Sequence, residues 1–209
     1  MTDTSEVVLD EETRRSAQNR TLGVLVASSV FARAAMTLGF AVAVLLIKDM
    51  LGGSTWAGLS TVAITVGTAV SAKMLSSYMN KKGRRPGIAL GYGAATAGGV
   101  VALIGAQTGS IILFLLGLVG VGIGSGASNL ARYAAADLAK PADKAKAISL
   151  IVFSATLGAV GGPSLVGMAD DAGQSIGLNE NVGPYALTVV FFAVGGLIVS
   201  ALLRPDPLV

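Results

Sequence analysis

No cysteine and no histidine occur among the 209 residues of the chain. Their absence excludes disulfide frameworks, thiol catalysis, zinc sites built from Cys and His, and every nucleophile that a histidine base would activate. We therefore expect neither an enzyme nor a protein that holds a metal ion or a cofactor.

Charged residues are also scarce, at 13% of the chain, which is about half the fraction typical of a soluble domain. Hydrophobic residues make up 53%, and the mean hydropathy is +0.72. They occur in long runs without an amphipathic period, which is typical of helices that face lipid. The net charge is +3, but the basic residues cluster in short loops beside the apolar runs. This placement favours a lipid bilayer, and not a nucleic acid, as the partner.

Six apolar runs are long enough to cross the hydrocarbon core of a membrane as helices, which takes about 20 residues. They cover 21–47, 55–78, 87–106, 110–137, 145–167 and 185–203. Small residues recur at every fourth position along the third and fourth runs, and this spacing lets helix backbones approach closely. We therefore predict an all-α integral membrane protein. Its six-helix transmembrane domain covers 21–203, flanked by an N-terminal tail at 1–20 and a C-terminal tail at 204–209.

Lysine and arginine are divided unevenly between the two ends of these runs. One side holds only Lys48 and an acidic loop after the fifth run. The other side holds Arg14, Arg15, Arg20, Lys81, Lys82, Arg84, Arg85, Lys140, Lys144, Lys146 and Arg204. Because basic loops stay in the cytoplasm, we predict a multi-pass protein of the cell (inner or plasma) membrane with both termini cytoplasmic.

One arginine lies deep within a run. Arg33 is about twelve residues into the first run, roughly 18 Å along the helix axis and near the bilayer midplane. An arginine at this depth costs at least ~2.5–3.5 kcal/mol on insertion scales, so it should face a cavity or a partner. Ser29 and Thr37 lie one turn before and after it on the same face. We predict that these three residues bind substrate. The alternative is a structural role, in which Arg33 pairs with backbone carbonyls or with an acid from another subunit.

The loop between the second and third runs carries a motif. Residues 76–86 read SSYMNKKGRRP, and they resemble the loop signature of the major facilitator superfamily. That signature is a glycine, an aspartate four positions later, and then basic–x–Gly–Arg–Arg/Lys. The matching positions are Lys81, Gly83, Arg84 and Arg85. Ser76 replaces the first glycine, and Asn80 replaces the aspartate. The resemblance implies that Asn80 and the matching residues form a gating loop, although Asn80 cannot supply the charge that the family's aspartate gives to a charge relay.

The fifth run carries a second motif. Residues 158–167 read GAVGGPSLVG and resemble the G-x-x-x-G-P-x-x-G-G signature of drug and proton antiporters in the same superfamily. The matching positions are Gly158, Gly162, Pro163 and Gly167, while Val166 replaces one glycine. Proline removes a helix hydrogen bond and bends a membrane helix, and the glycines let a neighbouring helix close onto the bend. The resemblance implies an antiporter-like kink in this span.

The end of the fourth run also resembles bacterial members of this superfamily, in which an acid closes the span and a proline and basic residues follow. Arg132 and Asp137 lie near this end, where long side chains reach water. We interpret both as charges of the cytoplasmic interface or of a gate, and not as substrate ligands.

Together these resemblances imply the N-terminal six-helix half of a transporter whose twelve spans form two related halves. We predict secondary active transport of a small molecule by alternating access, and the antiporter-like fifth span implies proton-coupled export. Two alternatives stay open: uptake or exchange of an anion held by Arg33, and a non-transporting membrane subunit or truncated remnant. Transport would require a second six-helix half, from a second copy or from a partner.

Overall fold

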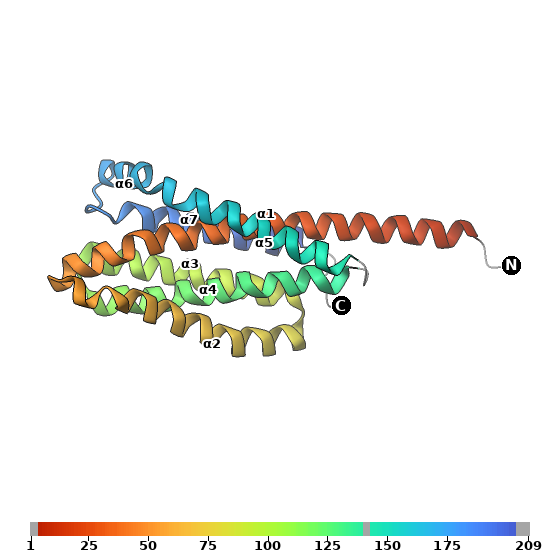
Figure 1. Cartoon of the computed structure of the whole chain (residues 1–209), viewed down its shortest axis with the longest axis horizontal. Helices are drawn as coiled ribbons and strands as arrows, with labels where there is room; N and C mark the ends of the chain where they lie inside the picture. The colour runs from red at the N-terminus through yellow and green to blue at the C-terminus, as the bar shows by residue number, and fades with distance from the viewer. Residues whose placement is uncertain (1–3, 140–142, 204–209) are drawn as a thin grey trace.

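The molecule is a bundle of long helices (Figure 1). The computed structural model describes residues 4–139 and 143–203, with their side chains from position 18 onward except at 54 and 138. The elements are α1 (Thr4–Leu51), η1 (Ser54–Trp56), α2 (Gly58–Lys82), α3 (Arg84–Thr108), α4 (Ile111–Leu138), α5 (Lys144–Ser164), α6 (Val166–Ser175) and α7 (Gly183–Leu202). The described residues contain no strand, so the predicted all-α class is confirmed.

Six segments are long and apolar enough to cross a membrane, as predicted. They are Gln18–Leu51, Gly58–Lys82, Arg84–Thr108, Ile111–Asp137, Lys144–Ser164 and Gly183–Leu202. The first helix starts earlier than its apolar run, because α1 continues back to Thr4 through most of the predicted N-terminal tail. The predicted C-terminal tail, 204–209, lies outside the described residues.

The fifth span ends earlier than the predicted 145–167. Pro163 has no N–H to donate and its ring crowds the preceding turn. The Leu165 N–H bonds back to the Gly162 carbonyl at 3.0 Å, and α5 ends at Ser164. Pro163 lies in the last turn of α5, and Gly167 lies in α6, so the residues of the predicted kink are divided between two helices.

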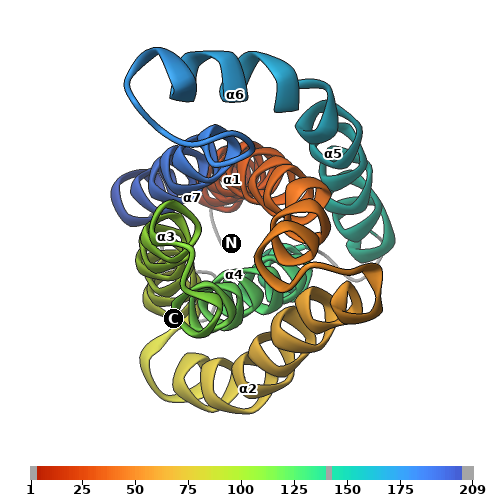
Figure 2. The same ribbon diagram turned by 90° about the vertical axis from the view of Figure 1, so that its left-hand side faces the viewer.

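The helices form an inner ring with two flanking helices (Figure 2). Helices α1, α7, α3 and α4 surround the centre of the view, and each packs against its neighbours in the ring. Helix α2 lies outside α4, helix α5 lies outside α1, and α6 crosses one end of the bundle. Buried aromatic side chains fill the interior at two levels, with Tyr92 near Phe192 at one and Phe114 near Tyr185 at the other.

Glycine makes the closest helix contacts possible. A Cβ atom added at Gly122 of α4 would lie 2.2 Å from the Ile64 carbonyl oxygen of α2, and one added at Gly120 would lie 2.6 Å from the Cα of Gly98 in α3. Real Cβ contacts are not that short, so these positions require glycine at this helix separation. The small residues at four-residue spacing thus lie where the backbones meet, as membrane helices pack.

Charge is separated between the two ends of the bundle. The end that carries the α2–α3 turn holds the exposed bases Lys81, Lys82 and Lys144. The opposite end holds α6 and the loop after it, with the acids Asp171 and Glu180. Of the basic residues predicted to be cytoplasmic, Lys140 and Arg204 lie outside the described residues, as do the side chains of Arg14 and Arg15.

Candidate functional site

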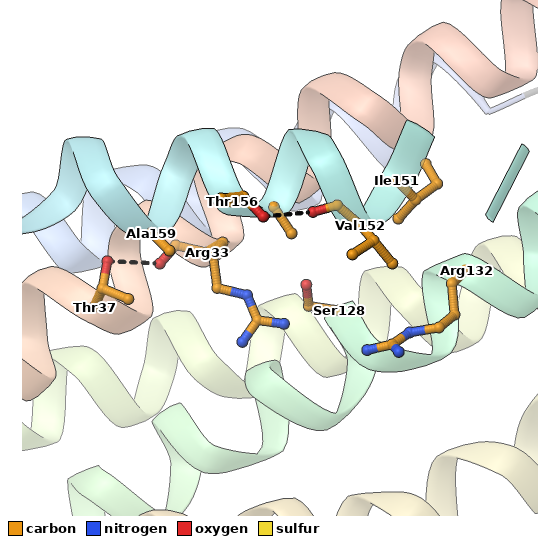
Figure 3. Close-up of a pocket in the computed structure, with 9 residues that line it drawn as sticks. Arg33, Thr37, Ser128, Arg132, Ile151, Val152, Thr156 and Ala159 are labelled. Atoms are coloured by element: carbon orange, nitrogen blue, oxygen red, sulfur yellow. Dashed lines mark hydrogen bonds between the residues drawn. The ribbon is translucent and has the colours of Figure 1, made fainter. Parts of the chain in front are cut away.

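A pocket of about 310 Å³ opens between α1, α4 and α5 (Figure 3). Its lining is Arg33, Thr37, Ser128, Arg132, Ile151, Val152, Ala155, Thr156 and Ala159. The α5 wall is mostly apolar, whereas α1 and α4 bring two arginines. The pocket therefore combines low polarity on one side with two positive charges on the other.

The two arginine side chains point toward each other (Figure 3). Arg33 lies close to the middle of its span, and Arg132 lies about a turn and a half before the end of its own. Side chains on a helix lean toward its N-terminus. Because α1 and α4 run in opposite directions, this lean brings the two guanidinium groups to the same level.

One carboxamide connects the arginines. The Asn129 Oδ1 atom accepts a hydrogen bond from Arg33 Nη2 at 3.2 Å and another from Arg132 Nη2 at 2.9 Å. Arg33 Nη1 also lies 3.8 Å from the sulfur of Met36. Among the described residues no carboxylate pairs with either arginine, so two cations share one neutral oxygen.

Ser128 adds an unsatisfied polar group to this pocket. Its side chain lies between the two guanidinium groups (Figure 3), and the residue is only 5% exposed. Its Oγ atom has no hydrogen-bond partner in the described part of the chain. The buried Tyr92 hydroxyl lies within reach of Ser128, so the Ser128 hydroxyl can interact both with Tyr92 and with a group in the pocket.

The two other predicted substrate ligands, Thr37 and Ser29, differ in their position relative to the pocket. Thr37 lines the pocket, but its hydroxyl donates to the Arg33 carbonyl at 3.0 Å and is therefore engaged with its own helix. Ser29 is fully buried and does not line the pocket. Of the three predicted substrate ligands, Arg33 and Thr37 thus line the pocket, and Ser29 does not.

Ser128 and Arg132 line the pocket and Asn129 contacts both of its arginines, but none of the three was predicted as a substrate ligand. A signal for them exists in the fourth run, where Asn129 is three and Ser128 four residues before Arg132. This spacing puts all three side chains on one face of a helix. Arg132 was interpreted as an interface charge because its backbone position lies far from the midplane. A position counted along the helix does not include the length of the arginine side chain.

The basic turn after α2 holds three helix ends together. Gly83 has a φ of 101°, which favours glycine, and it reverses the chain between α2 and α3. Arg84 Nε pairs with Asp137 Oδ2 of α4 at 2.8 Å, and the Arg85 side chain donates to the Ser200 carbonyl near the end of α7. Asn80 and Lys81 are exposed at the end of α2.

The motif in α5 lies against α1. A Cβ atom at Gly158 would lie 2.3 Å from the Val30 carbonyl oxygen, and one at Gly162 would lie 2.2 Å from Thr37 Oγ1. These two glycines therefore set the separation of the two helices that flank the pocket. Gly167 has no atom within 4 Å of such a Cβ and takes no part in this contact.

Comparisons with known proteins place this geometry among membrane carriers. A family model described as "MFS/sugar transport protein" matches residues 1–146. Two uncharacterized MFS-type transporters of Bacillus subtilis (strain 168), YdeG and YddS, are each 35% identical to the chain. The matches cover 95% and 94% of this chain, and 46% and 45% of those proteins.

A solved structure also has this arrangement of helices. The crystal structure of the human organic anion transporter MFSD10 (TETRAN) matches with a TM-score of 0.72 at 21% sequence identity. The match covers 91% of this chain and 48% of that one. The chain therefore spans about half the length of the curated relatives and of the solved structure that it matches.

Proposed function

Because this chain belongs to the major facilitator superfamily, we propose that it forms one six-helix half of a secondary carrier that moves a small organic anion across the membrane. The chain is a multi-pass membrane protein with six candidate spans. Carriers of this kind bind substrate near the bilayer midplane and expose the site to each side in turn. The second six-helix half would close the open side of the pocket.

The observation that carries this proposal is the pair of arginines that face one pocket. Like charges repel, and burial in an apolar environment strengthens the repulsion. An anion that bridges Arg33 and Arg132 would remove it, and an arginine forms strong, directional hydrogen bonds to carboxylate, sulfonate and phosphate oxygens. The Ser128 hydroxyl lines the same pocket and can add a further donor beside them.

A binding assay on the purified chain tests the proposal. We expect benzenesulfonate to raise the melting temperature of the detergent-solubilised protein more than the nearly isosteric neutral benzenesulfonamide or the cation benzylamine does. Arg33→Ala and Arg132→Ala should each remove this preference while the protein stays folded. An anion preference that survives both substitutions, or equal stabilisation by the neutral probe, would overturn the proposal.

The Arg33→Lys variant distinguishes bidentate hydrogen bonding by Arg33 from a contact that depends on its charge alone. Lysine keeps the charge but loses the planar fork of donors, so weaker binding of benzenesulfonate is expected. Full affinity in this variant would argue against bidentate binding by Arg33. A subunit that only packs against partners predicts a different result, since Arg33→Ala would then lower stability or assembly and change no probe preference.

Proton-coupled export is a second candidate, and the close packing of Gly158 and Gly162 on α1 is the observation that favours it. Both glycines belong to the segment that resembles the signature of drug and proton antiporters. Everted membrane vesicles with an acidified lumen should accumulate labelled benzenesulfonate, and a protonophore should abolish the accumulation. Accumulation that is equal with and without the protonophore would exclude proton coupling for this probe.

A further inference from the structure

The strongest unexplained feature of the pocket is the single oxygen that both arginines share. Asn129 Oδ1 accepts from Arg33 of α1 and from Arg132 of its own helix, at 3.2 and 2.9 Å. An oxygen of this kind has two lone pairs, so these two bonds use its full accepting capacity. The carboxamide therefore engages one nitrogen of each guanidinium group and competes for these donors with an anion bound in the pocket that the two arginines line.

The carboxamide is a weak partner for two guanidinium groups. It carries no net charge, so its dipole compensates the two positive charges only in part. Its bonds to the arginines are charge-assisted through the donors alone, whereas an anionic acceptor would add the attraction of a full negative charge to both cations. A carboxylate or sulfonate that enters the pocket would therefore compete successfully for the same donors.

We propose that the Asn129 side chain acts as a placeholder. It holds Arg33 and Arg132 together in the ligand-free protein, and a bound organic anion displaces it from the two guanidinium groups. The proposal rests on the anion-binding function proposed above and assigns to that site a residue that sets its affinity and its charge preference. Asn129 is a positioning residue: it acts on the substrate through the two arginines. Because its side chain is neutral, it orients the guanidinium groups without blocking the anion permanently.

Two substitutions at Asn129 should have opposite effects. Asn129→Ala removes the internal competitor and leaves the two cations uncompensated. We expect it to lower the melting temperature of the ligand-free protein and to tighten binding of benzenesulfonate by roughly threefold or more, the equivalent of one net hydrogen bond. Asn129→Asp has nearly the same shape and introduces a permanent internal anion. It should raise the melting temperature of the ligand-free protein and weaken benzenesulfonate binding by about tenfold or more.

The experiment measures the melting temperature without ligand and the dissociation constant of benzenesulfonate for the wild-type chain and both variants. Ser149→Ala is the matched control, since it removes one exposed hydroxyl from α5 outside the pocket and should change neither quantity. A purely structural role predicts that Asn129→Ala lowers both stability and affinity. That result would overturn the proposal, and so would an Asn129→Asp variant that binds the probe as tightly as wild type.

The outcomes also separate this proposal from the proposed function. If wild type prefers the anion through Arg33 and Arg132 but Asn129→Ala weakens binding, the placeholder role fails and the anion site stands. If wild type shows no anion preference, the proposed function fails. If Asn129→Ala does not fold, the Asn129→Asp variant still tests the proposal. The proposal predicts for it both a higher melting temperature without ligand and weaker binding of benzenesulfonate.

Discussion

At the scale of single residues, the contact between Arg84 and Asp137 connects the basic turn to the end of the fourth helix. The two side chains are 14% and 30% exposed and their N–O distance is 2.8 Å. A partly exposed pair of this kind contributes about 0.2–1 kcal/mol. We predict that Asp137→Asn lowers the free energy of unfolding by an amount in this range, measured by denaturant titration in mixed micelles.

A double-mutant cycle with Arg84→Gln isolates the pair itself. Arg84 makes further interactions, so its single substitution should cost more than Asp137→Asn, and the double variant should cost less than the sum of the two. Lys81→Gln in the same turn is the control, because Lys81 is exposed, and it should leave stability unchanged. Strictly additive effects of Arg84→Gln and Asp137→Asn would show that the contact contributes nothing.

At the scale of helices, the packing of α5 on α1 depends on individual glycines. A Cβ atom at Gly158 would meet backbone atoms of α1, with the Val30 carbonyl oxygen only 2.3 Å away. Overpacking of this kind typically costs about 1–3 kcal/mol. We predict that Gly158→Ala lowers the free energy of unfolding by this amount and, because α1 and α5 both line the pocket, weakens benzenesulfonate binding as well.

Gly161 provides a matched comparison on the same helix. A Cβ atom there has no neighbour within 4 Å, so Gly161→Ala should leave both stability and binding close to wild type. Equal behaviour of Gly158→Ala and Gly161→Ala would contradict the helix separation described here.

The number of membrane-spanning helices could be predicted from the sequence, but the additional helix α6 and the contacts between helices could not. Hydrocarbon thickness fixes the length of an apolar run that crosses the membrane, so six runs predict six spans. The end of α5 could not be predicted in the same way, because a proline can either bend a membrane helix or end it. In the structure α5 ends at Ser164 and α6 starts at Val166, so the chain passes from one helix to the next directly after Pro163.

The pocket was predicted only in part, for a physical reason. Depth in the membrane can be counted along a helix, and this count identified Arg33. The meeting of Arg33 with Arg132 depends on how α1 and α4 are rotated and offset, and no sequence spacing within one helix fixes those quantities. The close approach of α3 and α4 at Gly98 and Gly120 is likewise a property of the assembled pair.

At the scale of the whole molecule, the separation of charge between the two ends predicts an orientation in the membrane. The chain has no cysteine, so a single introduced cysteine can be labelled without background. Asn80 and Ser175 are both exposed and lie at opposite ends of the bundle, Asn80 at the basic end and Ser175 on α6. Replacing either with cysteine leaves the number of charges unchanged, so the substitution itself should not alter the orientation.

Since basic loops stay in the cytoplasm, a membrane-impermeant maleimide added to intact cells should label Ser175→Cys and leave Asn80→Cys unlabelled. After permeabilisation both variants should react, which shows that each thiol is accessible in the folded protein. The wild-type chain, which has no thiol, sets the zero level. Labelling of Asn80→Cys in intact cells would show that the basic turn lies outside the cytoplasm. The Arg84–Asp137 contact would then lie on the opposite side of the membrane from the one that the gating interpretation requires. Arg33 lies close to the middle of its span in either orientation, so this experiment tests the side on which the basic turn lies and leaves the pocket's preference for anions to the binding assays.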